Sequence, residues 1–245
     1  MTQRSGDAGT ERKGPALLVQ RLHEVRDRIR IAASAAGRKD TEIELLPVTK
    51  TIPTDVLRQA LALGLTRFGE NRVQEARDKA VSLRGSAAVF DLIGSLQKNK
   101  AGPSAEIFDR IHSLESGPTT EVLNRRAGGL GRKIEVLIEM NTSGEASKHG
   151  FPDLEGLLPL SESLLGMEHL DFRGLMTMGP FPASEKGSRA AFAKLRETRD
   201  QLALRLGRSL PALSMGMSED LEWAIMEGST LLRVGRALFG ERLLP

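Results

Sequence analysis

The stretch ELLPVTKT, from Glu44 to Thr51, is a short apolar run that ends on a single lysine, Lys50. A run rich in leucine and valine predicts a buried strand, and Pro53 indicates that a helix begins soon afterwards. An ammonium group is seldom buried without a partner. Lys50 therefore either marks the point where the strand reaches solvent, or it is a lysine at a barrel mouth whose lowered pKa prepares it for a Schiff base with an aldehyde.

Strand and helix patterns alternate along the whole chain. A helix is predicted from Pro15 to about Ala36, before the strand of Lys50. The strands predicted after it cover residues 66–71, 89–94, 110–114, 133–140, 172–178, 211–215 and 230–234. The helices predicted between and after the strands lie at 54–63, 73–83, within 98–107, at 119–127, 153–165, 188–206, 219–227 and from 237 onward. This alternation favours a parallel sheet with crossover helices.

Eight such units in 245 residues fit a closed (β/α)8 TIM barrel, which needs about 250 residues. No GxGxxG motif follows the first strand, which argues against a dinucleotide-binding Rossmann unit. Since no change in composition marks a second domain, we predict one α/β barrel over residues 15–245 with an extra N-terminal helix. Residues 1–14 are predicted to form a disordered tail. In such barrels the chemistry lies at the C-terminal ends of the strands.

Composition excludes several classes of function. The net charge is only +3 and aromatic residues make up 4%, which gives no case for binding nucleic acid. Cysteine is absent and the four histidines show no metal-ligand spacing, so we expect no disulfide and no metal site. No apolar run reaches the length of a membrane span, and residues 1–14 lack the apolar segment of a signal peptide. We therefore expect a cytoplasmic protein without a membrane partner.

The loops after the last two predicted strands carry hydroxyl, glycine and arginine groups. Gly235, in the segment from Arg233 to Arg236, lets the backbone approach a ligand closely, and the helix that follows favours an anion. Ser218, after the seventh strand, is predicted to cap the next helix. The loops after strands seven and eight of a barrel commonly hold a phosphate. Together with the solitary Lys50, this corner suits a phosphorylated aldehyde.

Six segments resemble, in order, the signatures of the pyridoxal phosphate homeostasis proteins. They are PVTK (47–50), RFGENRVQEARDK (67–79), LIGSLQKNK (92–100), RGLMTM (173–178), LSMGMSEDLEWAIMEGST (213–230) and LRVGRALFG (232–240). The resemblance runs from about residue 42 to residue 240. It implies a single-domain barrel similar to the N-terminal domain of alanine racemase, which carries pyridoxal 5′-phosphate (PLP) on a lysine.

The resemblance also implies how the cofactor is held. Lys50, in PVTK, matches the lysine that forms the Schiff base. Ser218 and the backbone of Gly235 and Arg236 match the phosphate site. The family usually has a small residue where this chain has Arg236, so the Arg236 side chain either adds a phosphate contact or points to solvent.

Three further residues belong to the expected surroundings of the ring. Arg233 resembles the arginine that faces the pyridine nitrogen in racemase-like barrels. An arginine stays protonated, so it would leave that nitrogen unprotonated and make PLP a poor electron sink. Asn71 ends the second strand and is expected near the cofactor. His112 ends the fourth strand and could reach the cofactor, but we expect it to be structural.

These features lead to one main hypothesis and two alternatives. The first is a PLP-binding protein that buffers or delivers the cofactor and so maintains intracellular PLP homeostasis, without substantial turnover and with no catalytic residue. Its partners would be PLP, amino or keto acids and PLP-dependent apoenzymes, and we expect a monomer.

The second is a racemase-like PLP enzyme, which needs an acid/base opposite the lysine. In alanine racemases that group is a tyrosine from an extra β-domain, and this sequence contains no tyrosine. The third, an interaction scaffold, leaves Lys50, Ser218 and Arg233 unexplained.

Overall fold

Each predicted strand–helix unit is present in the computed structural model, which describes residues 13–145 and 147–241. The strands are β1 (Glu44–Pro47), β2 (Arg67–Glu70), β3 (Val89–Leu92), β4 (Phe108–Leu114), β5 (Ile134–Met140), β6 (Leu170–Thr177), β7 (Ala212–Ser214) and β8 (Leu231–Val234). The helices are α1 (Lys13–Ala35), the short 3-10 helix η1 (Asp40–Glu42), α2 (Thr54–Ala62), α3 (Val73–Ser82), α4 (Lys98–Ile107), α5 (Gly117–Gly129), α6 (Leu154–Leu165), α7 (Glu185–Leu206), α8 (Leu221–Met226) and α9 (Arg236–Phe239).

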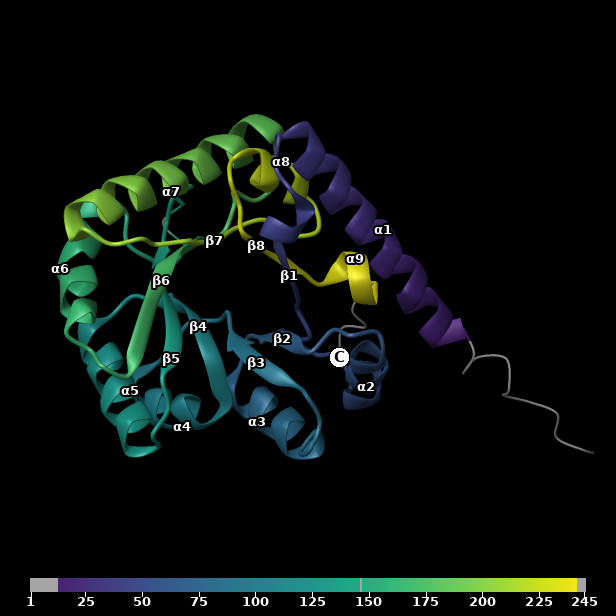
Figure 1. The fold of residues 1–245 in the computed structure, drawn as a ribbon, viewed down its shortest axis with the longest axis horizontal. Coiled ribbons are helices and arrows are strands. Elements are labelled where there is room, and N and C mark those ends of the chain that lie inside the picture. Colours follow the sequence, from purple (N-terminus) through teal and green to yellow (C-terminus); the bar gives the residue numbers. More distant parts are fainter. Residues whose placement is uncertain (1–12, 146, 242–245) are drawn as a thin grey trace, which may run out of the picture.

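The strands form one parallel sheet in the order β1-β8-β7-β6-β5-β4-β3-β2. Beyond the end of β1, an isolated bridge between Val48 and Gly69 connects the two edge strands, and the N–H of Thr49 donates to the carbonyl of Gly69 at 2.9 Å. This contact closes the sheet into a barrel with the helices outside it (Figure 1). The predicted (β/α)8 TIM barrel is confirmed.

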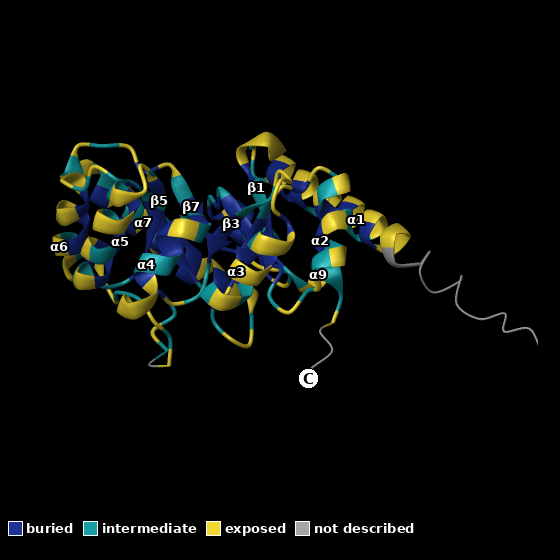
Figure 2. Cartoon of the chain, turned by 90° about the horizontal axis from the view of Figure 1, so that it is seen from below, coloured by how far each residue is buried: buried dark blue, intermediate teal, exposed yellow. Residues whose placement is uncertain are grey.

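The strands are buried because helices cover the outer face of the sheet and side chains fill the interior. In β5 all but one residue is buried, which explains its nearly continuous apolar sequence. The exposed residues lie mainly on the outer surfaces of the helices and in the loops (Figure 2). Within the described part of the chain, no helix is both long and apolar enough to cross a membrane.

The first helix, α1, lies outside the barrel against α8 and α9 (Figure 1). It buries Leu18, Leu22, Val25 and Ile29, which recur at the three- and four-residue steps of one helix face. The predicted extra N-terminal helix is therefore present. It begins at Lys13, two residues before the predicted start, and the remainder of the predicted tail, residues 1–12, lies outside the described residues.

Gly174, in β6, provides a test of how tightly the barrel wall is packed. A Cβ at this position would lie 1.9 Å from the carbonyl oxygen of Ala212 on the neighbouring strand. Because the clash is with backbone, we expect G174A to lower the free energy of unfolding by about 2 kcal/mol or more. G129A is the matched control, since nothing lies within 4 Å of its new methyl group at the end of α5. Urea unfolding should show G129A to be at least as stable as the parent.

Candidate functional site

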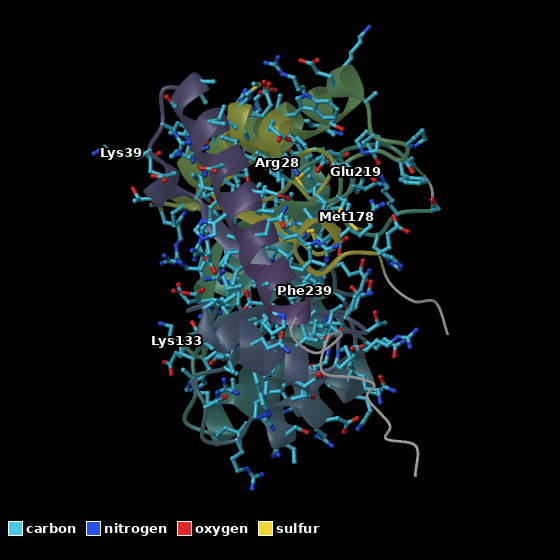
Figure 3. All side chains as sticks on the ribbon, turned by 90° about the vertical axis from the view of Figure 1, so that its right-hand side faces the viewer. Arg28, Lys39, Lys133, Met178, Glu219 and Phe239 are labelled. Atoms are coloured by element: carbon cyan, nitrogen blue, oxygen red, sulfur yellow. The ribbon has the colours of Figure 1, made fainter. Side chains whose placement is uncertain are left out.

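A cavity of about 250 Å³ opens at the C-terminal ends of the strands. Its lining comes from the segments that follow β1, β2, β3, β6, β7 and β8. Met178 and Glu219 both line the cavity, whereas Lys39 and Lys133 precede β1 and β5, and Figure 3 places the two pairs on opposite sides of the molecule. All six residues predicted for the cofactor site line this cavity: Lys50, Asn71, Ser218, Arg233, Gly235 and Arg236.

Lys50 lies in the turn between β1 and α2. It is half-buried, and it is the one lysine among the described residues that line the cavity. The preceding residue, Thr49, is buried and accepts a hydrogen bond from the N–H of Ile52 at 2.9 Å, which tightens the turn. Lys50 therefore places an amine at the C-terminal end of the barrel, just after β1, where the functional groups of this fold lie.

Asn71 reaches the same cavity from the end of β2. Its position depends on a close approach to Gly94, which follows β3. A Cβ on Gly94 would lie 2.3 Å from the carbonyl oxygen of Asn71, so only glycine allows these two strand ends to lie this close together.

Arg233, in β8, is buried inside the barrel with 4% of its surface exposed. Its guanidinium donates to the hydroxyl of Ser214 at 2.7 Å and to the carbonyl of Thr177 at 2.8 Å. Burial lowers the pKa of Arg233 to about 10, against the opposing influence of the Asp220 and Glu139 carboxylates. The side chain therefore stays protonated at neutral pH and retains N–H donors that can reach a ligand.

The Arg233 contact continues as a hydrogen-bonded chain through the barrel. The Ser214 hydroxyl accepts from Arg233, so its own proton is available for Nδ1 of His112, 2.9 Å away. The N–H at Nε2 of His112 then donates to Asp91 at 3.1 Å. Burial lowers the pKa of His112, consistent with this neutral tautomer. His112 is fully buried and does not line the cavity, so its structural interpretation is confirmed.

The loops after β7 and β8 meet at Ser218, although not as predicted. Helix α8 starts at Leu221, and its N-cap residue is Asp220, so Ser218 lies outside the first turn and does not cap this helix. The N-cap prediction was wrong. The Ser218 hydroxyl accepts instead from the N–H of Ala237 in α9 at 3.2 Å, while Asp220 accepts from the N–H of Met217 at 2.6 Å.

Two arginine side chains contact the residues around Ser218. The Arg236 side chain donates to Glu219 at 2.6 Å, with both side chains about half exposed, so it is paired with a carboxylate at the cavity rim. From α1, Arg28 donates to the carbonyl of Ser218 at 3.0 Å and pairs with Glu222 at 2.6 Å. The extra helix thus contributes directly to the shape of the predicted phosphate corner.

Sequence reasoning missed several polar residues near the cavity. Asp220 lines it and is 2% exposed, and burial raises its pKa. Nothing in the sequence indicated a role for Asp220 in the cavity, because an acid at the start of a helix usually only complements the helix dipole. Lys148 donates to the carbonyl of Gly179 at 2.6 Å and so ties the loop after β5 to the loop after β6.

Glu139 was missed as well, although an acid near the end of a buried strand is a usable signal. It is 3% exposed in β5, and burial, followed by the charge of Glu115, raises its pKa to about 7. Across residues 13–145 and 147–241, no cluster of three or more histidine, cysteine, aspartate or glutamate side chains could hold a metal ion.

Comparisons with known proteins identify the family of the chain. Residues 21–243 match the family model of the alanine racemase N-terminal domain. A pyridoxal phosphate homeostasis protein of Pseudomonas aeruginosa is 43% identical over 227 residues, which cover 92% of this chain and 96% of that protein. The solved structure of PipY from Synechococcus elongatus with PLP bound is 34% identical, with a TM-score of 0.79 over 91% of this chain and 100% of that chain.

More distant structures share the barrel alone. An alanine racemase of Clostridium difficile has a TM-score of 0.71 at 18% identity and matches 93% of this chain but 57% of the racemase chain. The agreement of the family model, the homologous sequences and the whole-chain structural match leads to one assignment. The chain belongs to the pyridoxal phosphate homeostasis protein family, within the larger group built on the alanine racemase N-terminal domain.

Proposed function

We propose that this protein binds PLP on Lys50 and maintains the supply of the cofactor by storing and delivering it, without substantial turnover. One observation carries the proposal: a single cavity brings together the amine of Lys50, the hydroxyl-bearing Ser218, the glycine turn at Gly235 and the buried Arg233. These groups come from the ends of three different strands. A scaffold protein would have no need of this convergence.

The donor set fits PLP. The lining contains three cationic side chains, Lys50, Arg233 and Arg236, against the two acidic residues Glu219 and Asp220, so the excess charge favours an anion. PLP supplies an aldehyde, which condenses with a lysine amine as water leaves. Lys50 provides that amine. Ser218 and the backbone at Gly235 and Arg236 lie in the corner where barrels of this type hold a phosphate.

Arg233 distinguishes a carrier from a carbanion-forming enzyme. It is protonated, and Ser214 and Thr177 hold its guanidinium in place, so it would donate a hydrogen bond to a ring nitrogen while keeping its own proton. A ring nitrogen without its own proton stabilises a carbanion poorly. The names of the relatives as homeostasis proteins also support a non-catalytic role.

The second candidate, a racemase-like enzyme, lacks an opposite-face base. The sequence has no tyrosine, and His112 is fully engaged by Ser214 and Asp91. The proposed role implies a cytoplasmic protein that exchanges PLP with apoenzymes and meets amino or keto acids at the cavity. We propose that it acts as a monomer.

The assignment of Lys50 is tested by absorbance and chemical trapping. With PLP the purified protein should show a band near about 420 nm that borohydride abolishes, and peptide mapping should place the label on Lys50. K50R should lose the band, whereas K98R, on the exposed start of α4, should keep it. Label on another lysine, or no band in the parent protein, would contradict the assignment.

The phosphate corner is tested with S218A. Loss of one charge-assisted hydrogen bond should weaken PLP binding by about tenfold to hundredfold, measured by equilibrium titration. S163A, in an exposed position of α6, should bind as the parent does. If S218A also binds as the parent does, the phosphate lies elsewhere.

The absence of turnover is tested with L-alanine and PLP-loaded protein. We expect slow exchange of the α-proton with deuterated solvent and no inversion, because Lys50 acts from one face only. Proton exchange is followed by NMR and inversion by a chiral assay of the alanine. Racemisation at about one turnover per second or faster, in the usual enzyme range, would favour the enzyme hypothesis.

A further inference from the structure

Lys79, in α3, is a buried cation that does not line the cavity. Its side chain is 7% exposed, and its Nζ donates to the carbonyl of Thr49 at 2.6 Å and to Oε1 of Glu70 and of Glu75 at 2.7 Å each. An ammonium has three donors, and each finds an acceptor here. The contact joins α3 to the backbone immediately before Lys50.

The same two carboxylates also bind the residues on both sides of Lys50. The hydroxyl of Thr49 donates to Oε1 of Glu70 at 2.6 Å, and the N–H of Thr51 donates to Oε1 of Glu75 at 2.6 Å. We call Glu70, Glu75 and Lys79 the turn clamp. It fixes the backbone before and after Lys50 while leaving the Lys50 side chain at the cavity.

Thr51 shows why such a clamp is needed. Its φ is 65°, and among the described residues it is the one non-glycine with a positive φ. A β-branched side chain disfavours this left-handed conformation. A strained residue of this kind persists only where its surroundings hold it, and the hydrogen bond to Glu75 supplies that restraint.

Charge balance makes Lys79 the central member of the clamp. Glu70 is fully buried, and its second oxygen, Oε2, has no hydrogen-bond partner within residues 13–145 and 147–241. Burial raises the pKa of Glu70, while the contacts with Lys79 and Thr49 oppose that rise. Removing Lys79 alone leaves this buried carboxyl without its cation, and it also removes the ion pair that Lys79 forms with Glu75.

We propose that Lys79 is a positioning residue for Lys50: through Glu70 and Glu75 it holds the strained turn that presents the Lys50 amine to the cavity. The inference deepens the proposed function and rests on its assignment of Lys50 as the lysine that binds PLP. Lys79 itself does not touch the ligand. Its loss should impair bond formation with the aldehyde more than it impairs binding of the phosphate-bearing ring.

That difference separates positioning from a purely structural role. Pyridoxine 5′-phosphate has the same ring and phosphate as PLP but carries a hydroxymethyl group in place of the aldehyde, so it cannot bond to Lys50. A variant that merely loosens the fold or the cavity weakens both ligands equally. A variant that misplaces the Lys50 amine weakens PLP selectively.

The variants are K79M, the charge-balanced double variant E70Q/K79M and the control R132M. The double variant is included because it buries no unpaired carboxylate if K79M fails to fold. Arg132 is a matched cation: it donates to the carbonyls of Ala105 and Phe108 and pairs with Asp109. It precedes β5 and therefore lies at the end of the barrel away from the cavity.

Titration of the full chain with each ligand gives the first readout. We expect E70Q/K79M, and K79M if it folds, to bind PLP about tenfold or more weakly, with a smaller band near about 420 nm. Pyridoxine 5′-phosphate affinity should stay within about threefold of the parent. R132M should match the parent for both ligands. Equal losses for both ligands, or no loss for PLP, would overturn the proposal.

Amide hydrogen exchange without ligand gives a second readout that does not depend on Lys50 chemistry. The Thr51 amide should exchange about tenfold faster in E70Q/K79M than in R132M, because it loses its ordered acceptor. Unchanged exchange would overturn the proposal. A parent protein that forms no band with PLP would instead refute the proposed function, so the two failures are distinguishable.

Discussion

The guanidinium of Arg233 is buried inside the barrel, and much of the interior is arranged to satisfy it. Removing such a cation from water is costly unless hydrogen bonds and counter-charges replace the solvent. Here the hydroxyl of Ser214 and the carbonyl of Thr177 accept directly, and His112 and Asp91 continue the chain to the other strands. The position of the charge beneath the cavity is therefore fixed by the core of the barrel, and the loops of the mouth only surround it.

Two separate sets of contacts hold the two ends of the cavity. On one side, Glu70, Glu75 and Lys79 restrain the backbone around Lys50. On the other, Arg28 reaches from α1 to the carbonyl of Ser218, and the hydroxyl of Ser218 joins α9. Lys50 and Ser218 are thus placed by separate contacts, which would suit the proposed ligand, reactive at one end and charged at the other. A helix outside the barrel, α1, therefore contacts a residue of the cavity lining directly.

The sequence alone predicts the barrel because apolar runs and amphipathic helices alternate regularly, and it predicts Lys50 because one lysine ends the first buried run. It cannot predict contacts between side chains distant in the chain. Lys79 lies 30 residues beyond Thr49, which it binds, and no local pattern reveals that contact. The role of Ser218 was misjudged for a different reason: helix starts are uncertain by one or two residues, and α8 starts two residues later than predicted, so that Asp220 occupies the N-cap position.

The barrel closes between its two edge strands, β1 and β2, next to the Lys50 turn. β1 pairs with β8 along its length, from Glu44 opposite Leu231 to Pro47 opposite Val234, but it meets β2 through a single bridge beyond its end. Side chains add to this bridge, because the residues before and after Lys50 bind Glu70 of β2 and Glu75 and Lys79 of α3. The Lys50 turn therefore contacts both neighbours of the seam, β8 through the pairing of β1 and β2 through these side chains. The position of Lys50 thus depends on two neighbouring strands at once, and a shift of either one would move its backbone relative to Arg233.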